Sequence, residues 1–92
     1  FTVPETVRNI AAYAFAGCSS LVSLTLSGNI AHMGAYAFAG CTSLTTVRIP
    51  ASVTSIGAGA FTSCPLQYAV VQKGSYADTW LKQNCPNAIL IY

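Results

Sequence analysis

The stretch Ala12-Tyr13-Ala14-Phe15-Ala16-Gly17-Cys18 recurs without change at positions 35–41. A looser copy, Ala-Gly-Ala-Phe-Thr-Ser-Cys, occupies positions 58–64. The copies begin at residues 12, 35 and 58, so the period is 23 residues. A fixed period of about 20 to 50 residues is typical of proteins built from stacked repeats. The repeat therefore predicts an architecture, although it identifies no ligand.

Aligning the three copies on their phenylalanine brings the rest of the sequence into register. Nearly every aligned column is apolar in all copies, which indicates that these side chains face a shared core. The main columns are Phe15, Phe38 and Phe61; Ala14, Ala37 and Ala60; Cys18, Cys41 and Cys64; Ile10, Met33 and Ile56; and Val7, Ile30 and Val53.

Each repeat predicts two extended pieces and one compact piece. Alternation of apolar and polar residues over 24–26, 47–49 and 69–71, and over the matching 1–3, favours four short parallel strands. The stretches 7–10, 30–33 and 53–56 form the second extended piece, and Gly34 and Gly57 allow a tight bend after two of them. The segment that contains the phenylalanine and the cysteine predicts one or two helical turns. The expected fold class is an α/β repeat solenoid with a parallel sheet of about four strands.

The periodic pattern ends after Val71. Ser75 is a suitable helix N-cap, with Asp78 near the positive end of the helix, and Pro86 would follow its end. Residues 88–92 then favour a short strand. We expect residues 1–71 to form a single repeat domain and residues 72–92 to form its C-terminal cap of turn, helix and strand. Tyr76 and Trp80 are expected to pack inside that cap.

The stretch Leu21–Asn29 fits the leucine-rich-repeat consensus LxxLxLxxN. The longer stretch Leu44–Cys64 resembles the BspA-like (Treponema pallidum-type) leucine-rich repeat, with its signature IPxxVxxIGxxAFxxCxxL. This resemblance covers residues 1 to about 75. It implies a right-handed leucine-rich-repeat coil in a secreted or cell-surface protein, often bacterial, that acts in adhesion or binds host proteins. It implies no catalytic residues.

Composition excludes several classes of function. Charged residues make up only 7% of the chain, and the net charge is +2. The four basic side chains are scattered, so we expect no nucleic-acid partner. No run approaches the roughly 18 apolar residues that a membrane span requires, so we expect no membrane insertion. Because the chain opens within a repeat, we expect a piece of a longer protein whose uncovered edge strand, Phe1–Val3, allows self-association.

Few side chains suit chemistry, and we predict neither an enzyme nor a metal or cofactor site. Cys18, Cys41 and Cys64 lie one coil apart rather than in zinc-ligand pairs, so they are expected to be small buried thiols. A disulfide between Cys64 and Cys85 is the alternative. His32, the only histidine, falls at a surface position of the repeat, and a catalytic triad would need an acid beside it.

The remaining candidate is the outward face of the predicted strands. It carries Ser23, Thr25, Thr46, Arg48, Tyr68 and Val70. Arg and Tyr are frequent at interface hot spots, which favours a protein-binding strip. The alternative is that Ser and Thr occur there only because they suit exposed strand positions, where cross-strand Thr pairs add stability. The leading hypothesis is a non-enzymatic protein-binding or adhesion module whose partner is a host or matrix protein. The alternative is a passive stalk or spacer between other domains.

Overall fold

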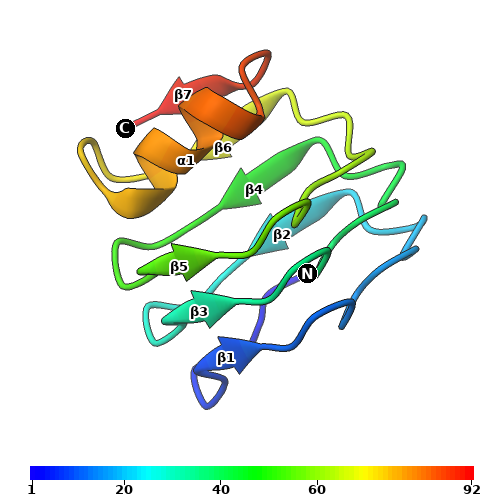
Figure 1. Ribbon diagram of the computed structural model, residues 1–92, viewed down its shortest axis with the longest axis horizontal. Coiled ribbons are helices and arrows are strands. Elements are labelled where there is room, and N and C mark those ends of the chain that lie inside the picture. The colour runs from blue at the N-terminus through cyan, green and yellow to red at the C-terminus, as the bar shows by residue number, and fades with distance from the viewer.

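The chain forms stacked coils in the computed structural model, which describes residues 1–92 (Figure 1). The apolar columns of the repeat line the inside of these coils. The strands β2 (Ser23–Thr25), β4 (Thr46–Arg48), β6 (Tyr68–Val70) and β7 (Ile89–Ile91) form one parallel sheet in that order. Leu24 pairs with Val47, which pairs with Ala69, so the strand register follows the repeat. The predicted α/β repeat fold with parallel strands is confirmed, and the strands start one residue earlier than expected.

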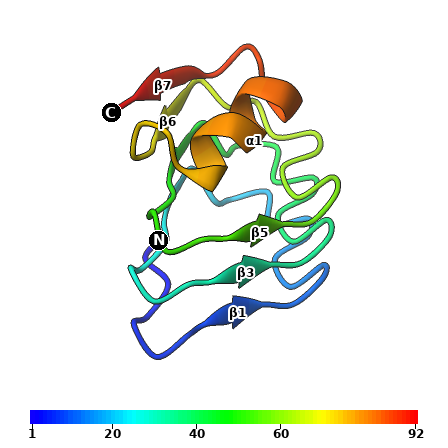
Figure 2. The same cartoon turned by 60° about the vertical axis from the view of Figure 1, so that its left-hand side comes forward.

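The second extended piece of each coil also forms a sheet, which the sequence did not indicate. It consists of β1 (Asn9–Ile10), β3 (His32–Met33) and β5 (Ser55–Ile56), all parallel. In each of these two-residue strands the apolar residue is buried and the polar residue is exposed. The two sheets form two sides of every coil, and the AYAFAGC segments form the third (Figure 2).

The expected one-to-two-turn helices in the repeats are not formed. The segments around Phe15, Phe38 and Phe61 are successive turns, and the only helix of the chain lies in the cap. Two positions per coil have positive φ: Tyr13, Tyr36 and Gly59 at 57° to 68°, and Gly17, Gly40 and Ser63 at 63° to 76°. A right-handed helix cannot pass through such residues.

The backbone of this third side alternates between local and inter-coil hydrogen bonds. In the first coil the amides of Ala14 and Ala16 bond within their own turn, to carbonyls three residues back. The amides between them point to the next coil, and Phe15 N–H donates to the Ala37 carbonyl at 2.8 Å. Phe38 N–H donates to Ala60 in the same way. The coils are therefore joined by backbone hydrogen bonds on all three sides. We call the bonds on the third side the turn ladder.

The glycine that precedes each turn segment is required by the close approach of the coils. A Cβ on Gly34 would overlap the backbone of Ala11 and Ala12, and one on Gly57 would overlap the backbone of Gly34 and Ala35. The equivalent residue in the first coil is Ala11. The sequence therefore uses glycine where two backbones pack against each other.

We predict that Gly34→Ala lowers the free energy of unfolding by about 3 kcal/mol, because the backbones of two coils must separate to admit a methyl group. Gly28→Ala is the matched control, since a Cβ there meets nothing within 4 Å. It should change stability by less than about 0.5 kcal/mol. Urea unfolding followed by circular dichroism measures both. Equal effects of the two variants would contradict the close packing at Gly34.

Aromatic rings stack in a column through the core. The ring centroids of Phe15 and Phe38 lie 5.1 Å apart, those of Phe38 and Phe61 lie 5.5 Å apart, and both pairs are nearly parallel. Trp80 packs against Phe61 edge-on at 6.0 Å and ends the column on the side of the cap. Each such pair adds about 0.5–1.5 kcal/mol beyond the area it buries. The repeated phenylalanine thus holds the stack together.

The N-terminal segment is less regular than the sequence predicts. Phe1–Val3 was expected to be a fourth repeat strand, but it makes only a single parallel bridge, between Thr2 and Thr25. Its register is the expected one, because Val3 N–H donates to the Thr25 carbonyl at 2.9 Å. The fourth strand of the sheet is instead β7, at the opposite edge. Phe1 is 60% exposed.

The cap contains α1 (Tyr76–Asn84) followed by β7. Ser75 is the N-cap and its side chain accepts from the Asp78 amide, as the sequence predicts. The helix lies next to β5, where the Tyr76 hydroxyl accepts from the Ile56 amide at 3.4 Å, while β7 extends the other sheet beside β6 (Figure 2). The cap therefore covers both sheets in different ways.

Asp78 is the only buried charged residue, and it ties the parts of the cap together. Its carboxylate accepts from the Gly74 amide at 2.9 Å and from the Tyr92 hydroxyl at 2.9 Å, and Lys82 Nζ lies 3.4 Å away. These contacts, the Gly74 amide above all, lower the pKa of the Asp78 carboxyl below its usual range. The carboxylate form is therefore the one that holds the turn, the helix and the end of β7 in place.

Because the pKa of Asp78 is lower in the folded state, its carboxylate stabilises the fold at pH values above the unfolded-state pKa of about 3.9. This stabilisation is lost as the pH falls through the folded-state pKa. We predict that the melting temperature falls on acidification below about pH 4. Asp78→Asn should melt lower at pH 7 and lose much of this dependence. Glu5→Gln, which removes the exposed acidic side chain, is the control. If the melting temperature of Asp78→Asn fell on acidification as much as that of the wild type, this role would be contradicted.

Candidate functional site

The six residues predicted to form a binding strip lie together on the outer face of the four-stranded sheet. Ser23, Thr46 and Tyr68 are register partners in one row, and Thr25, Arg48 and Val70 are partners in the next. Ser23, Arg48 and Tyr68 are exposed, and the other three are half-buried. The structure thus brings all six into one surface, with their inward neighbours in the core.

Sequence reasoning missed two members of this face. β7 places Ile89 beside Tyr68 and Ile91 beside Val70, so both rows continue onto the cap. Ile89 is 60% and Ile91 is 44% exposed, while Tyr68 is 43% exposed. The sequence signal that could have placed Ile89 on this face is spacing, since Ile89 follows Tyr68 by 21 residues, close to the repeat period. The face therefore changes from hydroxyl-bearing on β2 to apolar on β6 and β7.

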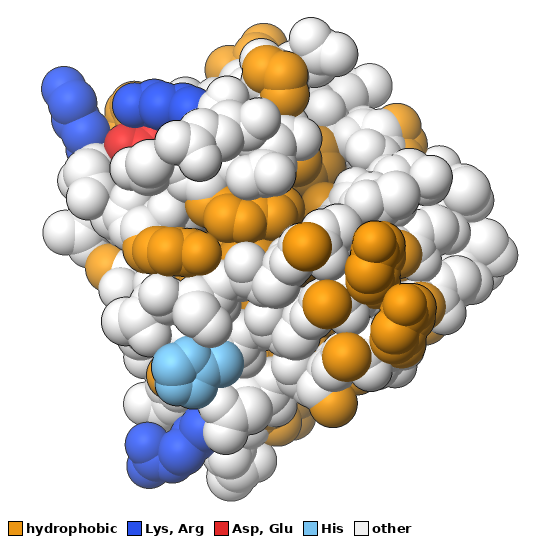
Figure 3. Space-filling model, viewed as in Figure 1, with side chains coloured by type: hydrophobic (Ala, Val, Ile, Leu, Met, Phe, Trp, Pro, Cys, Tyr) orange, Lys and Arg blue, Asp and Glu red, His pale blue; other side chains and the backbone are white.

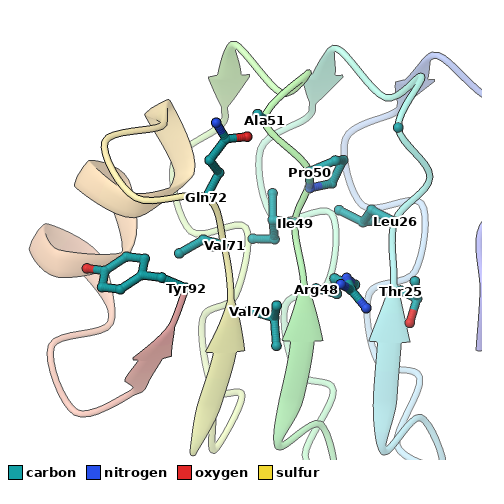
Figure 4. Close-up of a pocket in the computed structure, with 11 residues that line it drawn as sticks. Thr25, Leu26, Arg48, Ile49, Pro50, Ala51, Val70, Val71, Gln72 and Tyr92 are labelled. Atoms are coloured by element: carbon teal, nitrogen blue, oxygen red, sulfur yellow. The ribbon is translucent and has the colours of Figure 1, made fainter.

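A groove of about 640 Å³ adjoins this face where the strands end. Figure 4 shows Arg48 between Thr25 and Val70 at the ends of β4, β2 and β6, with Tyr92 beside the end of β6. Pro50 and Gln72 form part of the wall beyond the strands. The groove thus combines one cation with mostly apolar walls.

The charge of Arg48 is available to a partner. It is exposed and forms no salt bridge, because the single ion pair of the chain joins Lys82 to Asp78. No acidic side chain lines the groove beside it. An unpaired guanidinium next to exposed Tyr and Ile side chains suits a partner that offers a carboxylate and an apolar side chain.

The four cysteines are free thiols in the structure. Cys41 Sγ donates to the Phe15 carbonyl at 3.3 Å and Cys64 Sγ donates to the Phe38 carbonyl at 3.0 Å, so each thiol bonds to the coil before its own. Burial raises the pKa of Cys64 to about 11 and also raises the pKa of Cys41 and of Cys85. Cys18, in the first coil of the structure, is exposed, whereas the sequence predicts a buried thiol at this position.

His32 is exposed on β3, as the repeat alignment predicts (Figure 3). Its Nδ1 lies 3.2 Å from Ser55 Oγ on the neighbouring strand β5. Neither acidic side chain forms a salt bridge with His32. Asp78 is buried in the cap with its own hydrogen-bond partners, and Glu5 forms no salt bridge. No three His, Cys, Asp or Glu side chains lie close enough together to hold a metal ion.

Hydrophobic side chains also gather in rows over the turn segments, at the right of Figure 3. Tyr13 and Tyr36 stack there with ring centroids 5.3 Å apart, and the Tyr36 ring lies over Gly59. In the third copy glycine stands where the other two have tyrosine, and the Tyr36 ring occupies the space that a Cβ at position 59 would take. Tyr13 is 62% exposed, so this column is a surface feature.

Parallel strands that recur with the LxxLxL pattern define the chain as a leucine-rich-repeat protein. The model of the BspA type leucine rich repeat region matches residues 1–88 in six copies, and the chain belongs to this family. Comparison with curated proteins gives no match, and comparison with solved structures gives none. The family is typically non-enzymatic and is common in surface or secreted proteins. No helix has the length and apolarity to cross a bilayer.

Proposed function

We propose that this chain is a non-enzymatic protein-binding module of a secreted or cell-surface leucine-rich-repeat protein, acting in adhesion. The observation that carries the proposal is the outer face of the four-stranded sheet. It joins an unpaired Arg48 to exposed Tyr68, Ile89 and Ile91 in one continuous surface. Exposed isoleucines on a regular sheet cost solubility, which favours a surface that is covered by a partner.

The chemistry of this face supports a protein as the partner, such as a host or matrix protein. Tyr68 and the two isoleucines offer an apolar contact area with little side-chain freedom to lose, and Arg48 offers a bidentate donor for a carboxylate. The sequence family adds weight, because its members are common in surface proteins. Scarcity of acids and bases near His32 argues against an enzyme.

We predict that the chain binds at least one protein of a purified extracellular-matrix panel, and that Arg48→Ala combined with Tyr68→Ala weakens this binding about tenfold or more. Biolayer interferometry with the matrix protein immobilised measures the affinity. Raised salt should weaken the wild type more than the variant, because it screens the Arg48 charge.

Arg8→Ala is the matched control, since Arg8 is also exposed but lies outside the four-stranded sheet. It should bind as the wild type does. Equal binding by the double variant would contradict the site. Failure of the wild type to bind any panel member would favour the passive spacer.

A further inference from the structure

The turn ladder leaves its last set of donors without acceptors. In each of the first two coils, three alternate amides of the third side donate to the coil that follows. The equivalent amides of the last coil belong to Gly59, Phe61 and Ser63, and none of them has a hydrogen-bond partner in the chain. Phe61 is only 4% exposed, so its unpaired amide is costly.

The cap passes over this row without satisfying it. α1 stands above the last coil, and Trp80 covers Phe61 from the inside. Two adjoining cavities, of about 400 and 130 Å³, separate the row from the end of the helix. They share Phe61, Thr62, Asn84 and Cys85, so together they form one groove along residues 59–66. We call this the ladder-end groove.

The preceding coils show which groups accept hydrogen bonds from such a row of amides. Tyr36, Phe38 and Gly40 donate to carbonyls at 58, 60 and 62, at 2.8 to 3.0 Å. The acceptors are thus alternate carbonyls of a segment that has the same turn conformation as the donors, and in the two occupied rows five of the six belong to alanine. A ligand for the ladder-end groove must therefore offer alternate carbonyls beside small side chains.

Two other occupants fit less well. A second copy has free carbonyls at its N-terminal end, on Ala12, Ala14 and Ala16. It cannot stack on the last coil, because Trp80 already occupies the place above Phe61 where its own phenylalanine would lie. An anion would meet the negative end of the α1 dipole, since Asn84 and Cys85 line the groove.

We propose that the ladder-end groove binds a peptide segment rich in small residues, which takes up the turn conformation of the segments in the coils before it. Its alternate carbonyls accept from Gly59, Phe61 and Ser63, so the peptide continues the turn ladder by one more row. As in peptide binding by strand addition, backbone hydrogen bonds supply the contact, and the narrow groove selects small side chains. This site is separate from the outer face of the four-stranded sheet and does not depend on Arg48 or Tyr68.

The test is a titration of the ¹⁵N-labelled chain with acetyl-GASASAG-amide, followed by amide chemical shifts and hydrogen exchange. In the free chain the amides of Gly59, Phe61 and Ser63 should exchange faster than those of Tyr36, Phe38 and Gly40. Peptide at millimolar concentration should shift the first three in a saturable way and slow their exchange. Slow exchange without peptide, or no saturable shift, would overturn the proposal.

Asn84→Phe tests the location, because Asn84 lines both cavities and a larger side chain fills them. It should weaken peptide binding at least about fivefold. Gln83→Phe, on the same helix but outside both cavities, should bind as the wild type does, and unfolding curves of both variants establish that they fold. Equal binding by Asn84→Phe would overturn the site. Arg48→Ala should leave the titration unchanged, which separates this site from the outer face of the four-stranded sheet.

Discussion

The backbone hydrogen bonds between successive turn segments are the constraint on which the rest of this structure depends. For alternate amides to reach the next coil, the chain must turn through positive φ twice per coil, at the positions of Tyr13 and Gly17 and their equivalents. Neighbouring backbones must also come close, which requires glycine at 34 and 57 and small side chains at the acceptor positions. The repeated AYAFAGC sequence therefore encodes a spacing between coils.

The other features of the core follow from that spacing. Coils held together by backbone bonds lie about 4.8 Å apart, which is near the separation at which phenylalanine rings stack. The observed centroid distances of 5.1 and 5.5 Å agree with it. The thiols of Cys41 and Cys64 are small enough to fill the same layer and to donate to the coil before. Columns that face inward are thus nearly constant, and the columns that vary face outward.

The period and the apolar columns predicted the parallel sheet and its register, because burial on one face determines them. The helical cap followed from the N-cap residue Ser75, from Asp78 and from Pro86. Helical turns were predicted wrongly for the AYAFAGC segment, since its spacing of Phe15 and Cys18 fits a helix as well as a turn. Only the inter-coil bonds decide between them, and sequence spacing does not report these. The strip from Ser23 to Tyr68 followed from the alignment. Ile89 and Ile91 did not, because β7 joins the sheet from outside the repeat.

The most direct test of this account is the detection of scalar couplings across hydrogen bonds in the ¹³C,¹⁵N-labelled chain. The account predicts couplings from the Phe15 amide nitrogen to the Ala37 carbonyl carbon and from the Phe38 amide nitrogen to that of Ala60. Couplings from Phe15 to Ala11, and from Phe38 to Gly34, would instead indicate i→i−4 bonds of a helix. That result would contradict the turn ladder as the basis of the stack.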